Sequence, residues 1–304
     1  NLNVGQMENR GIEIALNTTN IQNGDFSWTT SFNATMIKNE VTALSNDNSD
    51  IISVFNIVRV GEPIGTLYGF KGMGVNPANG NPLYETQDGR LIQGNADDNS
   101  YYLYDPENPN ELTPTTALSA TTDKFLLGQT NPKVFGGLTN SVTFKGFDLN
   151  VVLTYAMGQN VFNGTRQNGL TMFFQNNTSE IKNRWTPANP NTNVPRLSLN
   201  NDNFYNLSSS LNAGNAQSTW VEKGDYVRIQ NISLGYTLPS DLLSSIGLQR
   251  LRVYGSIQNP YVFTKYKGLD PELNVSSTSN IISGVDLNTN PLVRTWTLGL
   301  NVSF

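Results

Sequence analysis

The end of the chain alternates strictly between large apolar and small or polar side chains. Within Arg294–Phe304 the apolar positions are Trp296, Leu298, Leu300, Val302 and Phe304. A period of two residues places the apolar and polar sets on opposite faces of a β-strand. Chain ends in soluble domains usually fray, and an apolar terminal strand would be left as a sticky, unpaired edge. The pattern therefore predicts a strand whose apolar face and edge are covered.

The same alternation recurs upstream and predicts an all-β chain of about nine antiparallel strands. In Phe147–Tyr155, for example, a large apolar residue occupies every second position. The predicted strands are Arg10–Leu16, Phe26–Met36, Ile51–Val60, Ile64–Phe70, Val134–Phe144, Phe147–Tyr155, Tyr226–Leu238, Arg250–Gln258 and Arg294–Phe304.

The connections between these strands are of two kinds. Short turns, such as Lys145-Gly146, alternate with long excursions that cover about Lys71–Asn131, the stretch up to about Ser218, and Asn259–Val293. If the strands pair in order, every short turn lies at one end of the sheet and every long loop at the other. This asymmetry is typical of outer-membrane barrels, in which closure satisfies the backbone groups in lipid. We therefore expect a transmembrane antiparallel β-barrel.

Strand length agrees with this fold. The eight steps from Trp296 to Phe304, at ~3.3 Å each and a tilt of ~40°, rise ~20 Å, close to the ~25 Å apolar band of a barrel. Two soluble folds, a lectin-like sandwich and a propeller, also have alternating strands. Propellers repeat every ~40–45 residues, and no such period occurs here. Sandwiches rarely carry three long excursions at one end, so the barrel explains the pattern better.

Composition narrows the chemistry of the protein. Charged residues make up 14% of the 304 residues, against ~25% in ordinary soluble domains, and the formal net charge is -5. A negative chain does not suit a nucleic-acid partner, whereas a surface rich in Asn, Thr, Ser and Gly suits sugars or peptides. The chain has no Cys and no His, which removes thiolate nucleophiles, imidazole bases and the commonest metal ligands. We expect no enzyme activity, no cofactor and no metal site.

Several stretches resemble one known family in both sequence and order. They include "NRGIEIALN", "GEPIGTLYGFKGMGV", "LGQTNPKVFGGLTNSVTFKGFDLNVVLTYAMGQNVFN", "RWTPANP", "WVEKGDYVRIQNISLGYTLP", "LRVYGSIQNPYVFTKYKGLDPE" and "TWTLGLNVSF". The family is that of the SusC/RagA-like TonB-dependent transporters of Bacteroidetes-type outer membranes. The resemblance implies a 22-stranded barrel around an N-terminal plug, a SusD-like surface lipoprotein that covers the loops, and energy supplied through TonB. Residues 1–304 would then be the C-terminal part of the barrel, with the plug and the first strands outside this sequence.

Candidate binding residues are aromatic side chains in the long loops, because aromatic rings stack on sugars and cover apolar ligand surface. We expect Phe173, Phe174, Tyr205 and Trp220 to contact the ligand or the lid. Trp185 lies in "RWTPANP", for which the resemblance implies a structural role.

Acidic residues offer two further candidates for chemistry. The clusters Asn46–Asp50 and Asn95–Ser100 could bind calcium, but neither has the spacing of a calcium loop, so a solvated loop is the preferred interpretation. Asp270 and Glu272 could act as the paired carboxylates of a glycosidase. Since they lie in the family motif "YKGLDPE", we interpret them as loop architecture.

The function implied is TonB-dependent import of an oligomeric nutrient, a glycan or possibly a peptide, across the outer membrane of a Gram-negative bacterium. Expected partners are a SusD-like lipoprotein, TonB through the missing N-terminal region, lipid and lipopolysaccharide, and the outer-membrane assembly machinery during biogenesis. The alternative is a barrel fragment or folding cargo bound to that machinery, with a structural rather than a transport role. In either case Trp296, Leu298, Leu300, Val302 and Phe304 would form both the barrel seam and the assembly signal.

Overall fold

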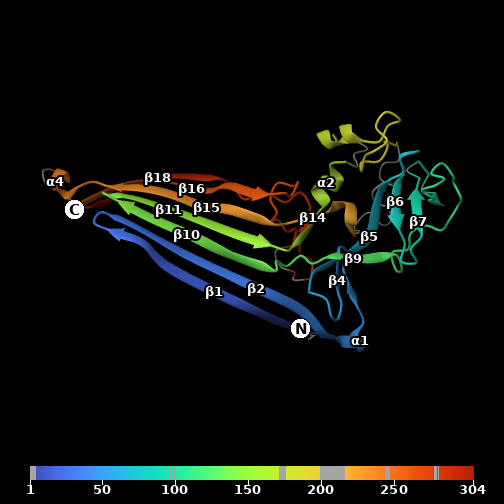
Figure 1. Cartoon of the computed structure of the whole chain (residues 1–304), viewed down its shortest axis with the longest axis horizontal. Coiled ribbons are helices and arrows are strands. Elements are labelled where there is room, and N and C mark those ends of the chain that lie inside the picture. Colours follow the sequence, from blue (N-terminus) through green and yellow to red (C-terminus); the bar gives the residue numbers. More distant parts are fainter. Residues whose placement is uncertain are drawn as a thin grey trace.

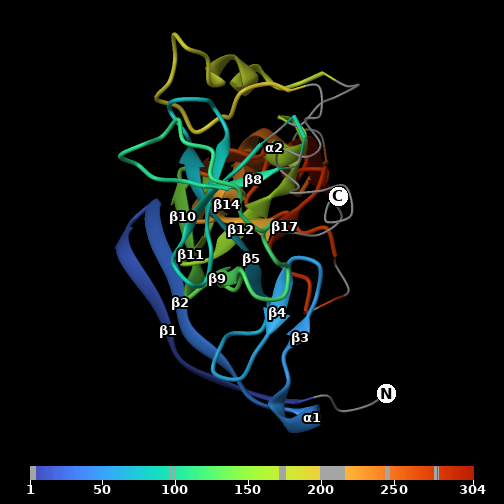
Figure 2. The ribbon, with the colours of Figure 1, turned by 90° about the vertical axis from the view of Figure 1, so that its right-hand side faces the viewer.

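The computed structural model describes residues 5–95, 97–98, 100–170, 176–198, 216–243, 247–276, 279 and 281–304. Its main element is a seven-stranded antiparallel sheet, which we call the wall (Figure 1). In spatial order its strands are β1 (Gly5–Asn23), β2 (Phe26–Leu44), β10 (Val134–Phe144), β11 (Phe147–Met157), β15 (Tyr226–Thr237), β16 (Arg250–Thr264) and β18 (Thr295–Ser303). The wall curves into an arc when seen along its strands (Figure 2).

Consecutive wall strands are neighbours in space, so the three short connections lie at one end of the sheet (Figure 1). The turn between β10 and β11 is the tightest. Lys145 and Gly146 both have positive φ, at 45° and 85°, which is the conformation of a two-residue hairpin loop that follows the twist of the strands. The C-terminus lies at this end as well (Figure 1).

One face of the wall is apolar and exposed. A single row across all seven strands follows from the register: Ile21, Trp28, Val142, Leu149, Leu234, Gly255 and Leu298. Leu298 is 90% exposed, and Ile12, Leu234 and Leu300 are each more than half exposed. Such a broad exposed apolar surface is what a sheet presents to hydrocarbon.

The opposite face of the wall is polar. The row beside the apolar one is made only of Ser, Thr and Asn: Thr19, Thr29, Ser141, Asn150, Ser233, Ser256 and Thr297. It lies one residue along each strand, or two in β1, where a bulge separates Thr19 from Ile21. Within it, the Asn150 amide donates to Ser141 Oγ at 2.8 Å. The two faces thus present opposite polarities to their surroundings, with the polar one on the concave side expected to line a lumen.

A small polar group interrupts the apolar face. Trp28 Nε1 and Thr30 Oγ1 both donate to Asn140 Oδ1, at 2.9 and 2.8 Å, and the Asn20 amide donates to Thr30 Oγ1 at 2.6 Å. Polar groups that face lipid are costly unless they find partners within the protein. These mutual hydrogen bonds meet that requirement.

The long connections form a second body at the other end of the wall, which we call the loop layer. It comprises the described residues within 45–133, 158–225 and 265–294, and these contain two sheets (Figures 1 and 2). Its larger sheet contains β3 (Ile51–Ile52), β4 (Asn56–Val58), β5 (Thr66–Val75), β6 (Pro82–Glu85), β7 (Leu91–Gly94), β8 (Tyr101–Leu103), β9 (Lys124–Gly128) and β13 (Ala216–Gln217). The smaller one contains β12 (Asn160–Asn163), β14 (Val221–Lys223) and β17 (Val285–Asp286).

The described helices are all short. They are α1 (Ser45–Asn48), α2 (Gly164–Asn168), α4 (Ser240–Leu243) and the 3₁₀ turns η1 (Ser179–Asn183) and η2 (Ser218–Trp220). None of the helices in the described parts of the chain has the length and apolar character needed to cross a membrane.

The loop layer corrects the prediction of nine wall strands to seven. Ile51–Val60 and Ile64–Phe70 were expected in the wall, but β2 pairs directly with β10. The first segment forms only the short strands β3 and β4, far below the ~9–11 residues of a spanning strand. Thr66–Phe70 is buried at every position, so both faces of β5 are covered by protein. Alternation alone did not distinguish these strands from wall strands.

The loop layer has the apolar core of a water-soluble domain. One cluster contains Leu67, Phe162, Leu170, Trp220 and Val285, and a second contains Phe70, Tyr84, Ile92, Tyr101 and Leu118. The first cluster joins β5, β12, η2 and β17, which come from all three excursions. The three excursions therefore fold as one body rather than as separate loops.

Candidate functional site

The polar residues that could act on a passing solute lie on the polar face of the wall and at its junction with the loop layer. Arg252 on β16 reaches across β15 to Asp148 on β11, with its Nε 2.9 Å from Asp148 Oδ1. Gly235 lies between them, and a Cβ there would come within 2.4 Å of Arg252 Nη2. The glycine therefore leaves room for an ion pair that spans three strands on the polar face.

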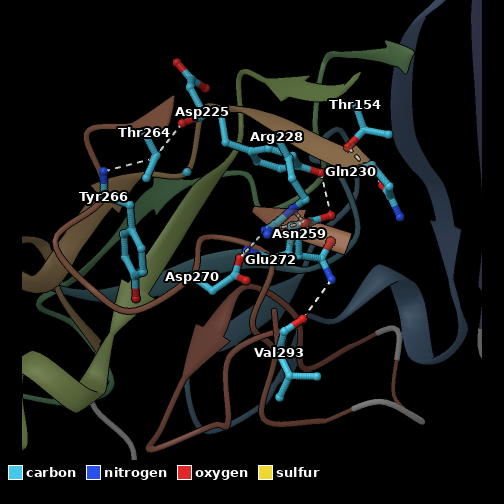
Figure 3. Close-up of polar contacts among 12 residues, drawn as sticks. Thr154, Asp225, Arg228, Gln230, Asn259, Thr264, Tyr266, Asp270, Glu272 and Val293 are labelled. Atoms are coloured by element: carbon cyan, nitrogen blue, oxygen red, sulfur yellow. Dashed lines mark hydrogen bonds and ion pairs between the residues drawn. The ribbon is translucent and has the colours of Figure 1, made fainter. Parts of the chain in front are cut away.

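A second arginine joins the wall to the third excursion (Figure 3). Arg228 on β15 pairs with Asp270 through Nη2 and with Glu272 through Nε, both at 2.6 Å, and the Tyr226 hydroxyl donates to Glu272 Oε1 at 2.6 Å. The Arg228 and Asp270 residues are 3% and 2% exposed. We call Arg228, Asp270 and Glu272 the mouth clamp, because they hold the loop against the inner side of the wall.

The contacts of the mouth clamp distinguish the two roles considered for Asp270 and Glu272, a glycosidase pair and a structural element of the loop. One guanidinium binds both Asp270 and Glu272, and the Glu272 backbone N–H also donates to Asp270 Oδ1 at 3.1 Å. A catalytic carboxylate must be free to reach the substrate, whereas both of these carboxylates are bound to the buried Arg228 guanidinium. Their geometry agrees with the loop-architecture interpretation.

Other contacts tie the third excursion to its surroundings. The Tyr266 hydroxyl and Thr165 Oγ1 both donate to Asp286, each at 2.8 Å, and Asp286 is buried. Burial, followed by the bond to Asp286, raises the pKa of Tyr266, so this tyrosine stays protonated. Asn259 Nδ2 donates to the Val293 carbonyl at 3.2 Å, closing the base of the excursion (Figure 3). The excursion is thereby fixed on the wall.

A third arginine organises the loop layer. Arg166 of α2 binds Glu180 through Nε at 2.8 Å and Glu222 through Nη1 at 2.9 Å, and its guanidinium stacks over the Trp220 ring at 5.1 Å. The hydrogen bond from Arg166 lowers the pKa of Glu180 below its usual range. The Lys267 backbone N–H donates to Glu222 Oε2 at 2.8 Å. This group links the second excursion to the third.

Beside this group lies an open cleft of about 360 Å³, within the size range of ligand pockets. Its lining comes from β5, α2, η2, β14 and the loop after β16: Gly72, Gly74, Arg166, Asn193, Val194, Ser218, Thr219, Trp220, Glu222 and Lys267. We call it the Arg166 cleft. Sequence reasoning missed it, because its walls meet only when the three excursions pack together.

Of the four aromatic residues predicted to contact the ligand or the lid, only Trp220 lies among the described residues. Phe173, Phe174 and Tyr205 lie outside the described residues. Trp220 is 1% exposed and belongs to the loop-layer core, and it also borders the Arg166 cleft, so its predicted contact with a ligand stays a prediction. Trp185, assigned a structural role by resemblance, donates through Nε1 to the Pro77 carbonyl at 2.9 Å and so joins two excursions.

The acidic clusters behave as loop residues. Asp50 pairs with Arg59 at 2.7 Å, and Asp97 pairs with Arg196 at 2.7 Å while accepting a bond from Ser198. Among the described residues, no group of three or more acidic side chains is placed to hold a metal ion.

Four of the five predicted seam residues lie on β18, at one edge of the wall, and the fifth, Phe304, follows the strand. Trp296, Leu298, Leu300 and Val302 pair with Ile257, Gly255, Val253 and Leu251 of β16. They project on the apolar face, as the alternation predicts, and the other edge of the wall is β1. Neither edge pairs with a further described strand of the wall. Their roles as seam and assembly signal remain predictions.

An exposed apolar face, a polar concave face and long loops at one end together define part of an outer-membrane β-barrel wall. Comparison with known proteins supports this class. No family model matches the chain. It is 32% identical to TonB-dependent receptor P3 of Formosa agariphila, over 99% of this chain and 29% of that protein. It is 26% identical to TonB-dependent receptor SusC of Bacteroides thetaiotaomicron, over 99% of this chain and 27% of that protein.

Solved structures show the same fold. The RagAB peptide transporter matches 99% of this chain and 29% of its own, with a TM-score of 0.73 and 22% identity. The RagAB peptide importer in its 'closed-closed' state gives a TM-score of 0.73 at 23% identity, covering 99% of this chain and 30% of that one. Along nearly its whole length the chain is therefore similar to TonB-dependent receptors and shares the fold of the RagAB transporter, and it spans less than a third of the length of these relatives.

Proposed function

We propose that the chain is the C-terminal part of a TonB-dependent importer that carries an oligomeric nutrient across the outer membrane. The observation that carries the proposal is the polar row on the concave face of the wall, opposite an apolar row that suits lipid. A continuous lining of Ser, Thr and Asn offers hydrogen bonds to a hydrated solute without holding it by charge. The similarity to receptors named SusC and to the RagAB transporter supports the same function.

A glycan is the proposed cargo, and a peptide is the alternative. Neutral donors and acceptors on the polar row match sugar hydroxyls, and SusC is among the relatives of the chain. The alternative rests on the similarity of the fold to RagAB, a peptide transporter. The relatives compared here are named as receptors or transporters, which supports a protein without covalent chemistry.

The proposed partners follow from the two ends of the wall. A SusD-like lipoprotein would cover the loop layer, with Phe173, Phe174 and Tyr205 in reach of lid or ligand. TonB would act through the region upstream of this chain, and lipid and lipopolysaccharide would contact the apolar face. The assembly machinery would read the β18 residues Trp296, Leu298, Leu300 and Val302, and Phe304 after them.

The test is uptake by cells that carry the full-length protein. Fluorescent oligosaccharides and oligopeptides should be scored in wild-type cells, in cells lacking the transporter and in cells lacking TonB. Import of either class should require both the transporter and TonB. Normal uptake without the transporter, for every cargo that the cells take up, would contradict the proposal. Replacing Phe173 and Phe174 together with Ala should weaken uptake or lipoprotein binding while the barrel keeps its resistance to heat.

A further inference from the structure

We propose that the Arg166 cleft binds a carboxylate group of the imported ligand, with Lys267 as the cation that recognises it. The inference rests on the proposed import function and names the chemistry that the loop layer selects. The argument compares the acceptors around the cleft, which already accept hydrogen bonds from the protein, with the donors, some of which have no protein acceptor among the described residues.

The carboxylates at the cleft are already used. Glu222 Oε1 accepts from Arg166 Nη1, and Glu222 Oε2 accepts from the Lys267 backbone N–H, at 2.9 and 2.8 Å. Both oxygens of Glu180 accept from the Arg166 guanidinium. A cationic ligand group would have to compete with these short bonds. The cleft is therefore a poor site for an amine.

The donors at the cleft are in surplus. Arg166 uses its Nε, one Nη1 and one Nη2 hydrogen, which leaves two of the five N–H groups of a guanidinium. The exposed Lys267 ammonium has three donors and makes no ion pair with the described residues. Asn193 adds an exposed amide to the lining. A group rich in acceptors, such as a carboxylate, would satisfy these donors.

The shape of the cleft suits a small polar group. A Cβ on Gly72 would lie 2.3 Å from Thr219 Oγ1, so glycine allows β5 to approach η2 closely. Gly72 and Ser218 exchange hydrogen bonds, with the Gly72 N–H donating to Ser218 Oγ at 2.9 Å. The stacked Arg166 and Trp220 form a rigid wall, because the arginine is also bound to two carboxylates. The site is thus largely pre-formed, which lowers the entropy lost when a ligand binds.

Two kinds of ligand carry such a carboxylate: a glycan with uronic acid units and a peptide with a free C-terminus. Binding to the purified full-length transporter would be measured by calorimetry with an oligouronate, a neutral oligosaccharide of the same length, a peptide acid and the same peptide as its amide. We expect at least one carboxylate probe to bind more tightly than its neutral counterpart. The probe that does so identifies the source.

The key variant is Lys267→Met, with Lys265→Met as the matched control, because Lys265 is exposed nearby but does not line the cleft. Loss of one charge-assisted bond should weaken the carboxylate probe about tenfold in Lys267→Met. Lys265→Met should bind as the wild type does, and Lys267→Arg should retain most of the affinity. Added salt should weaken the wild type and leave Lys267→Met nearly unchanged.

Two results would overturn the inference. One is equal affinity of the wild type for carboxylate and neutral probes, and the other is equal affinity of Lys267→Met and wild type for the carboxylate probe. Neither result touches the import function, which TonB-dependent uptake in cells tests separately. Conversely, the transporter could bind carboxylate probes and yet import nothing. That result would support the carboxylate site and contradict the proposed import function.

Discussion

The wall and the loop layer are built from the same kinds of residue but bury them in opposite ways. In the wall, Leu298 is 90% exposed on the apolar face, and the polar row lies on the opposite face. In the loop layer, Trp220 is 1% exposed and the apolar residues form closed clusters. Each arrangement is stable only in its own solvent, hydrocarbon for the outer side of the wall and water for the loop layer. The wall therefore places its apolar side chains outside and the loop layer places them inside, and each arrangement can be tested separately.

The largest expected effect concerns the loop-layer core. Trp220→Ala should remove a fully buried ring and cost ~3–5 kcal/mol of local stability. Hydrogen exchange of α2, η2 and β5 should rise, while the heat resistance of the barrel in detergent stays unchanged. If the barrel loses heat resistance as much as the loop layer loses protection, the two bodies are not independent.

The mouth clamp is the next most sensitive point, because it joins the two bodies. Arg228→Leu leaves the buried Asp270 without its cation, a change that typically costs ~3–5 kcal/mol, less whatever the third excursion recovers by moving into water. We expect proteolysis of residues 265–294 to increase in intact cells. The double variant Arg228→Leu with Asp270→Asn should recover part of the loss, since no unpaired charge remains. Unchanged proteolysis in the single variant would contradict the anchoring role.

The wall itself is tested by moving a charge one residue along β18. Leu298→Arg places a cation on the apolar face and should cost ~2–4 kcal/mol, whereas Thr297→Arg, on the polar face, should cost much less. The free energy of unfolding of the full-length protein in lipid distinguishes the two. Equal losses at both positions would show that the outer face of β18 does not contact lipid.

A smaller effect is expected at the end of the chain. Deleting Phe304 removes one exposed ring, so the finished fold should lose little stability, whereas assembly in cells should suffer more. Outer-membrane abundance and the free energy of unfolding should be measured on the same deletion. Normal abundance together with a loss of several kcal/mol would make Phe304 a packing residue instead of an assembly signal.

The smallest effect is electrostatic. Because Arg166 lowers the pKa of Glu180 in the folded state, this ion pair contributes stability above the ordinary carboxyl pKa of 4.5. The contribution is lost as the pH falls through and below that value. Hydrogen exchange of η1 in the wild type should therefore rise, relative to Glu180→Gln, as the pH is lowered, while the wall shows no such difference. An identical pH dependence in both proteins would show that the Arg166–Glu180 ion pair does not stabilise η1.

The sequence predictions were more accurate for the wall than for the loop layer. All seven wall strands were predicted, and β10, β11, β15 and β18 begin and end within two residues of the predicted bounds, because their two-residue period persists over a length set by the membrane. The observed β1, β2 and β16 are longer than predicted, reaching Asn23, Leu44 and Thr264, because their backbone ladders continue beyond the predicted stretch of alternation. The two segments wrongly predicted as wall strands are Ile51–Val60 and Ile64–Phe70. Both lie in the loop layer, where strands do not need the length of a membrane-spanning strand.

The sequence by itself determined the polarity of the wall, the order of short and long connections and the resemblance to a receptor family, because these depend on spacing along single strands. Only the tertiary structure decided which strands enter the wall, that Trp220 is buried, and that Arg228 binds Asp270 and Glu272. It also assembled the Arg166 cleft from three excursions. These features depend on contacts between residues far apart in the chain, and local periodicity contains no information about which distant segments meet.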